Sequence, residues 1–152
     1  MIQNLRQAFL FKIVSIVVIS LVIVQTGCTV RLISSYDDKT DNAITDLHKK
    51  FEIFFLTLES QEGLPECKYE NHTEFYKDAK VSISMIEVRA RAIPDNEITI
   101  KQIALLKENI ELLEQLHIYS CLSKEQIEPL RISFNSGFTA ILKLELAKKR
   151  GE

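Results

Sequence analysis

Two cysteines and two histidines have the widest chemical scope in this chain. Cys67 and His72 lie five positions apart, and His117 and Cys121 lie four positions apart. Two thiolates and two imidazoles would suit a tetrahedral zinc ion, although these spacings are loose for a zinc motif. The two thiols can instead form a disulfide, which an oxidising compartment favours. The choice depends on where the chain resides and on which elements carry the four residues.

The first 27 residues predict an export signal. Arg6 and Lys12 are the only charged residues before Cys28, and an apolar run without charge extends over residues 13–24. A basic start, an apolar stretch and small residues before a cleavage point are the parts of a secretory signal. A helix of about 12 residues spans about 18 Å, which is short of the roughly 30 Å hydrocarbon core of a bilayer. The alternative is an uncleaved N-terminal helix that anchors the chain in the inner membrane.

Cys28 resembles the acylated cysteine of bacterial lipoproteins. Thr26 and Gly27 resemble the small pair of their lipobox, although Gln25 stands where that family usually has leucine. The resemblance implies cleavage after residue 27 and attachment of diacylglycerol, with acyl chains such as palmitate, to the Cys28 sulfur. Several acyl chains would hold the protein stably on a membrane. Because Thr29 and not aspartate follows Cys28, the resemblance implies the periplasmic face of the outer membrane.

After a short tether over residues 28–36, the apolar pattern predicts a helical domain over residues 37–152. Apolar positions recur at spacings of three and four, which is the period of one helix face. They are Ile44, Leu47, Phe51, Phe54 and Leu58; Phe75, Ala79, Ile83, Ile86, Ala90 and Ile93; Ile103, Leu106, Ile110, Leu113 and His117; and Ile127, Leu130, Phe134, Gly137, Ile141 and Leu144. Four such helices joined by short turns fit an all-α antiparallel four-helix bundle. A fourth helix that packs elsewhere, or in a dimer, is the alternative.

Turn and cap residues separate the predicted helices. Gly63 precedes Pro65 in the order expected after a helix end, and Pro94 ends the second helix, which starts near residue 71. A capping box at Ser123 starts the fourth helix. Pro129 lies too deep for a first-turn proline and predicts a kink or a separate initial turn. The basic residues 148–150 are expected to serve the C-terminal end of the helix dipole.

The bundle topology favours the disulfide over zinc. In an antiparallel bundle the first and third connections lie at the same end, and they carry Cys67 and Cys121, respectively. Export to an oxidising compartment then predicts a Cys67–Cys121 disulfide across 54 positions. His117 is interpreted as a partly buried helix residue, and we expect no metal and no cofactor.

Charge and motifs narrow the class of function. From Cys28 onward the chain has 17 basic and 21 acidic residues, a net charge of 17 − 21 = −4. Such a domain offers no basic face for nucleic acid. The sequence also lacks the nucleophile elbow, metalloprotease, phosphate-loop and CxxC motifs. We therefore expect no enzyme and no nucleic-acid partner.

Two segments, RLISSYD at residues 31–37 and LSKEQIEP at residues 122–129, resemble helical bacterial lipoproteins of uncharacterised function. That resemblance implies an address and a fold but no activity. We expect a membrane-anchored envelope lipoprotein with a non-catalytic structural or protein-interaction role, bound to an unknown protein partner. The alternative is a periplasmic binder of a small apolar ligand or metal, within the bundle or at its end.

Overall fold

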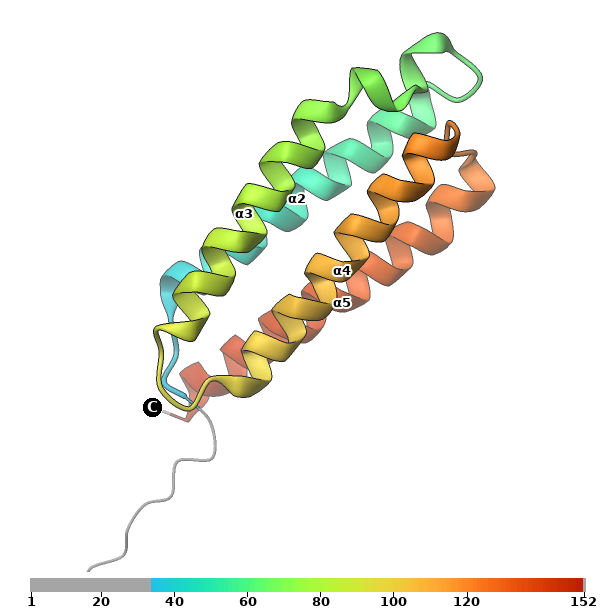
Figure 1. The fold of residues 1–152 in the computed structure, drawn as a ribbon. Coiled ribbons are helices and arrows are strands. Elements are labelled where there is room, and N and C mark those ends of the chain that lie inside the picture. Colours follow the sequence, from blue (N-terminus) through green and yellow to red (C-terminus); the bar gives the residue numbers. More distant parts are fainter. Residues whose placement is uncertain (1–33, 152) are drawn as a thin grey trace, which may run out of the picture. The chain divides into compact units, whose positions relative to one another are not determined.

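The computed structural model describes residues 34–151, which form an all-α domain (Figure 1). Its α-helices are α2 (Asp38–Ser60), α3 (Thr73–Arg91), α4 (Glu97–Tyr119) and α5 (Lys124–Arg150). Two short 3-10 helices, η1 (Pro65–Cys67) and η2 (Tyr69–Asn71), lie between α2 and α3. The predicted all-α bundle is confirmed. The predicted signal or anchor helix and Cys28 lie outside the described residues.

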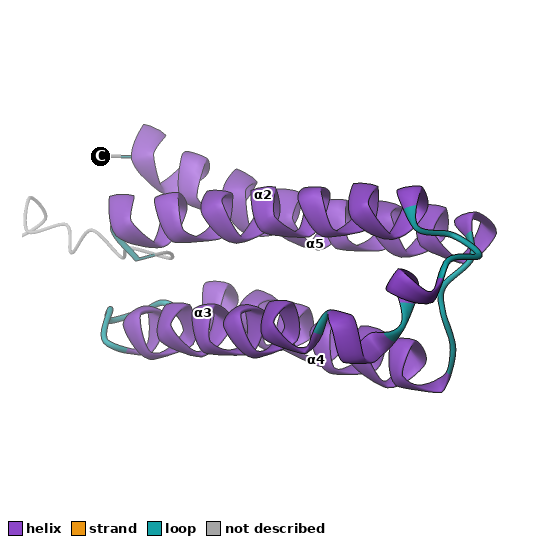
Figure 2. Ribbon diagram, turned by 90° about the horizontal axis from the view of Figure 1, so that it is seen from above, coloured by secondary structure: helices purple, strands orange, loops and turns teal. Residues whose placement is uncertain are grey.

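The four helices pack as an antiparallel bundle of two pairs. Figure 2 shows α2 beside α5 and α3 beside α4, and contacts between α2 and α3 and between α4 and α5 join the pairs. The α2–α3 and α4–α5 connections share one end of the bundle, called the disulfide end below. Residues 34–37, the α3–α4 turn and the last turn of α5 share the other end, called the entry end (Figure 1).

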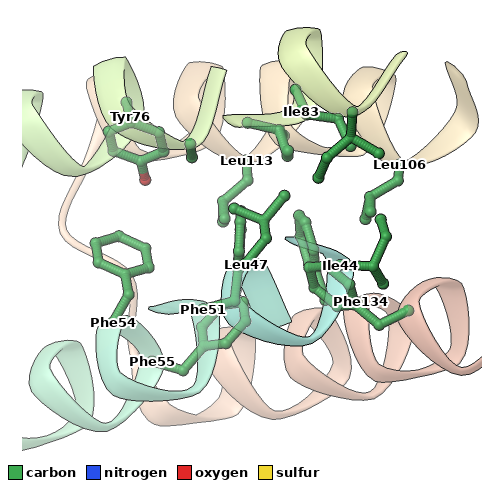
Figure 3. Close-up of a cluster of buried hydrophobic side chains, with 14 of the residues drawn as sticks. Ile44, Leu47, Phe51, Phe54, Phe55, Tyr76, Ile83, Leu106, Leu113 and Phe134 are labelled. Atoms are coloured by element: carbon green, nitrogen blue, oxygen red, sulfur yellow. The ribbon is translucent and has the colours of Figure 1, made fainter. Parts of the chain in front are cut away.

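Apolar side chains from all four helices fill the space between the pairs (Figure 3). Phe51 of α2 stacks on Phe134 of α5 with ring centroids 4.6 Å apart. Phe54 of α2 stacks on Phe75 of α3 at 3.7 Å. Aromatic side chains remove large apolar areas from water, so these pairs are a main source of the stability of the bundle. Every inward position predicted for α2 and α4 is buried.

The inward face predicted for the second half of α5 is confirmed at Ile141 but is wrong at Gly137 and Leu144. Phe138 and Glu145 are buried, whereas the predicted Gly137 and Leu144 are only partly buried. The helix is turned toward α2, where the ring of Phe138 stacks on that of His48 with centroids 4.8 Å apart. A rotation of one residue moves the stripe by about 100°, so the apolar pattern alone did not decide between these neighbouring positions.

The predicted capping box at Ser123 starts α5, but the helix has no separate initial turn before Pro129. The helix begins at Lys124 and continues through Pro129, so the predicted separate initial turn is wrong. Both hydrogen bonds of the capping box are present between Ser123 and Gln126. Because proline lacks only one backbone donor, this cap and the buried side chain of Ile127 can hold the first turn together.

Candidate functional site

The disulfide end brings together the two cysteines expected to pair. Cys67 lies in η1 and Cys121 lies between α4 and α5, and a disulfide joins them with their Cα atoms 5.5 Å apart. This separation falls within the usual range for a disulfide. The bond ties the α2–α3 connection to the α4–α5 connection and thereby links the two helix pairs.

The two histidines of the zinc alternative lie beside this disulfide. His117 is buried, and its Nε2 donates to the Cys67 carbonyl at 2.7 Å while its Nδ1 accepts from the Tyr76 hydroxyl at 2.8 Å. His72 Nε2 lies 3.1 Å from the Gln61 side-chain oxygen, and burial lowers the pKa of His72. Among residues 34–151, no group of three or more histidines, cysteines and carboxylates could hold a metal ion. The nitrogens of His117 are thus engaged in fixing η1 against α3 and α4.

A buried polar cluster lies at the entry end. Lys148 Nζ donates to Asn96 Oδ1 at 2.7 Å, to Thr99 Oγ1 at 2.8 Å and to Glu145 Oε1 at 2.5 Å. Glu145 and Lys148 are 0% and 3% exposed. Ser34 is also buried and donates to the same Asn96 oxygen at 2.8 Å. Part of the predicted tether is therefore packed on the domain. Lys148 lies in the last turn of α5, as predicted, but its side chain is buried in this cluster.

Asp37 and Arg89 form a second polar contact at the entry end. Asp37 caps α2 by accepting from the backbone N–H of Thr40 at 3.0 Å. Arg89 of α3 donates through Nε and Nη2 to the two carboxylate oxygens of Asp37, at 2.6 and 2.5 Å. These hydrogen bonds from Arg89 lower the pKa of Asp37 to about 2. The same carboxylate thus starts α2 and fastens it to α3.

This geometry predicts an acid-dependent loss of stability. Because folding lowers the pKa of Asp37, its stabilising effect is complete above the usual value near 4 and disappears as the pH falls through about 2. An asparagine at this position would cap equally well but carries no charge. We therefore expect Asp37→Asn to lower the free energy of unfolding at neutral pH, and the difference from wild type to shrink toward pH 2. Urea unfolding across this range measures it.

The control for this prediction is Asp38→Asn, which removes a charge from the same first turn of α2 at an exposed position. Asp38→Asn should change the stability much less than Asp37→Asn at neutral pH. An Asp37→Asn difference that stays constant with pH would contradict the assignment of the effect to ionised Asp37.

An apolar groove of about 620 Å³ runs between α2 and α3. On its α3 wall, Val81, Met85 and Val88 are 57%, 68% and 66% exposed. Ala43 and Leu47 of α2 form the opposite wall. Exposed large apolar side chains that gather on one surface mark a binding site more often than isolated ones do. We call this surface the α2–α3 groove.

The groove has a nearly neutral rim. Lys50 pairs with Asp78 across the two helices at 2.6 Å, and Arg89 pairs with Asp37. Lys39 and Asp46 supply one further charge of each sign at the groove. A second hollow of about 340 Å³ shares Lys50 and continues between the same helices toward the disulfide end. The α2–α3 groove is therefore an elongated apolar surface whose rim does not favour a partner of either charge.

No protein-family model, curated protein or solved structure matches the chain. None of the helices within residues 34–151 is long and apolar enough to span a bilayer.

The predicted pairing of Cys67 with Cys121 is present in the structure, whereas the α2–α3 groove and the buried polar cluster around Lys148 were not predicted. The sequence contains a pattern that could have predicted the groove. Val81, Met85 and Val88 are apolar residues at spacings of four and three, beside the inward stripe of α3. No comparable sequence pattern predicts the buried polar cluster around Lys148. A lysine three residues after a glutamate near a C-terminus is usually a solvated pair.

Proposed function

We propose that this protein is an envelope lipoprotein, held on a membrane through Cys28, whose helical domain binds another protein without catalysing a reaction. The α2–α3 groove carries the binding part of the proposal, because it exposes three large apolar side chains on one face. The Cys67–Cys121 disulfide supports export, since such bonds persist in oxidising compartments. The lipobox-like Thr26-Gly27-Cys28 supports the anchor.

The shape of the groove favours a helical partner. Its walls are two neighbouring helices, and the apolar residues of α3 project at helical spacing. An amphipathic helix could pack its apolar face between these walls, as in other helix-in-groove complexes. The nearly neutral rim suits a partner that is held by apolar contact more than by charge.

A second candidate is a small apolar ligand. The volume of about 620 Å³ lies within the range of small-molecule sites. This candidate keeps the same groove but replaces the partner helix with a compound that would raise the stability of the fold by mass action.

One labelling experiment separates the two candidates. The chain contains only two methionines, Met1 and Met85, so a photoreactive methionine labels the mature chain at position 85 alone once the signal is removed. Irradiation of growing cells should give an adduct with a second protein. Val88→Glu should abolish the adduct, whereas Leu146→Glu, on an exposed position of α5, should preserve it.

An adduct between Met85 and a small molecule, abolished by Val88→Glu, would support the apolar ligand in place of the protein partner. Absence of any adduct that depends on Val88 would reject a binding role for the groove. The intact mass of the membrane-extracted protein tests the anchor separately. We expect loss of residues 1–27 and a gain of acyl groups, both abolished by Cys28→Ala, whereas a full-length mass without lipid would reject the lipoprotein assignment.

A further inference from the structure

His72 connects three elements at the disulfide end. It directly precedes α3, and its Nε2 lies 3.1 Å from the side-chain oxygen of Gln61 and 3.1 Å from the backbone carbonyl oxygen of Glu66. Both oxygens can only accept, so Nε2 carries a hydrogen and donates to them. Gln61 follows the last residue of α2, and Glu66 lies in η1. We call His72 with these two hydrogen bonds the His72 latch.

The ring of His72 also packs on aromatic side chains at this end of the bundle. It contacts Phe54 of α2 edge to face with ring centroids 5.5 Å apart, and the ring of His117 lies 5.3 Å away. Phe54 and Phe75, which stack on each other, line the hollow of about 340 Å³ together with His72. Phe54 is 4% exposed and His72 is 9% exposed. The closed latch therefore helps to cover the Phe54 ring where the α2–α3 groove continues toward the disulfide end.

The hydrogen-bond partners of His72 are neutral, since one is a side-chain amide and the other a peptide carbonyl. The charged or titratable groups of the elements around it are Lys50 of α2, Asp78 and Tyr76 of α3, His117 of α4, Glu66 of η1 and Tyr69 of η2. Lys50 and Asp78 neutralise each other in an ion pair, and the Glu66 side chain is exposed. Burial raises the pKa of both tyrosines, which are neutral hydroxyls. Among the described residues, no carboxylate therefore holds a proton on the His72 ring.

The surroundings of His72 instead oppose its protonation. Burial, and then the proximity of His117, lower the pKa of His72 below its usual value of 6.5, and the hydrogen bond to the Glu66 carbonyl offsets this only in part. A solvated histidine keeps the usual pKa, so protons favour the open state of the latch. The stabilising effect of the closed latch is therefore complete above about pH 6.5 and is lost as the pH falls below this value toward the lowered pKa.

A protonated His72 is expected to turn toward water. Burying a charged ring without an anionic partner costs more free energy than exposing it. Gln61 and Glu66 then lose the Nε2 donor, and Phe54 loses the ring that packs on it. The Cys67–Cys121 disulfide still ties η1 to the α4–α5 connection, so the change stays local.

We propose that mild acid opens the His72 latch, uncovers Phe54 at the disulfide end of the α2–α3 groove, and thereby strengthens the binding of a partner there. A longer apolar groove removes more apolar surface from water when it is occupied. The effect on binding rests on the proposed function, because it requires an occupant of the groove. The opening of the latch depends on the domain alone.

Amide hydrogen exchange in the full chain, extracted in detergent, tests the latch. Exchange of residues 61–72 is compared at one pH unit above and one below the usual histidine pKa, and is corrected for the intrinsic effect of pH. Because the chain has three histidines, His72→Gln and His48→Gln form a matched pair. Glutamine retains an N–H donor but does not titrate. His48 lies on the other side of α2, against Asn135 and Phe138 of α5.

The opening equilibrium of residues 61–72 should rise severalfold between the two pH values, up to about tenfold, in the wild type and in His48→Gln. It should not change in His72→Gln. The exchange of α4 should stay slow throughout, which shows that each variant is folded. A rise in His72→Gln equal to that of the wild type would overturn the proposal. In the wild type itself, a His72 ring resonance that titrates at or above pH 6.5 would also overturn it.

The adduct formed by photoreactive Met85 tests the effect on binding. In isolated envelopes, its yield should rise on acidification for the wild type and for His48→Gln, and should not change for His72→Gln. Exchange that depends on His72, together with an adduct yield that is independent of pH, would overturn the regulation of the groove.

The two measurements distinguish this proposal from the proposed function. A Met85 adduct in a chain whose residues 61–72 exchange independently of His72 would reject the latch and leave the proposed function intact. Exchange that depends on His72, in a chain without any Met85 adduct, would keep the latch and reject the binding role of the groove.

Discussion

Reduction of the Cys67–Cys121 disulfide is expected to lower the free energy of unfolding by roughly 4 kcal/mol. The bond closes a loop of 54 positions, and the chain-entropy model gives this magnitude for a loop of such length. Since a domain of this size has a total stability of about 5 to 15 kcal/mol, the loss is a large fraction of the whole. Urea unfolding with and without a reductant measures the difference.

A variant with both cysteines replaced by alanine is the control for this measurement. The reduced wild type retains both sulfur atoms, so its loss reports the cross-link alone, whereas the double variant also loses the buried Cys67 side chain. We expect the double variant to be slightly less stable than the reduced wild type. A reduced protein as stable as the oxidised one would show that the loop at the disulfide end is already restricted in the unfolded chain.

The second large effect is expected at the buried pair of Lys148 and Glu145. Lys148→Met removes the cation but leaves the Glu145 carboxylate buried. Among the described residues, Thr99 Oγ1 at 3.3 Å and the Asp37 N–H at 3.5 Å still donate to this carboxylate. Breaking one side of a buried ion pair typically costs about 3 to 5 kcal/mol. We expect a loss of this size in chemical unfolding at neutral pH.

The double variant Lys148→Met with Glu145→Leu separates charge burial from packing. Because no unpaired charge remains, its stability should return to within about 1 to 2 kcal/mol of the wild type. In the double variant, Asn96 Oδ1 still accepts a hydrogen bond from the Ser34 hydroxyl. A double variant as unstable as Lys148→Met would instead assign the stabilisation to the hydrogen bonds of Lys148 with Asn96 and Thr99.

The parts of the fold that the sequence predicted are those in which the apolar period alone decides the outcome. On α2 and α4, large side chains such as Phe51, Leu106 and Leu113 recur without ambiguity, and each is buried. On α3 and α5 two neighbouring positions are both plausible. Tyr76 is buried and the predicted Phe75 is only partly buried, because tertiary contacts decide how far the helix is turned.

The candidate sites likewise divide into those that the order of the helices predicts and those that depend on tertiary contacts. The pairing partners Cys67 and Cys121 were predicted from topology, since loop positions follow directly from the order of the helices. The groove is lined by exposed apolar side chains that are not part of the core. Because the apolar period was used to find core positions, it did not indicate Val81 and Met85. The burial of Lys148 depends on residues distant in sequence, so no local signal could indicate it.

The burial of Ser34 limits how far the domain can stand from a membrane. Only six residue steps separate Cys28 from Ser34, and a fully extended chain gains at most about 3.6 Å per residue, or roughly 20 Å in total. A bundle whose longest helix has 27 residues is itself about 40 Å long. If Cys28 carries an acyl group, the tether from Cys28 to Ser34 is shorter than the bundle that it holds on the membrane. A partner bound to the domain would then lie within roughly 60 Å of the bilayer, which is the length of the tether and of the bundle together.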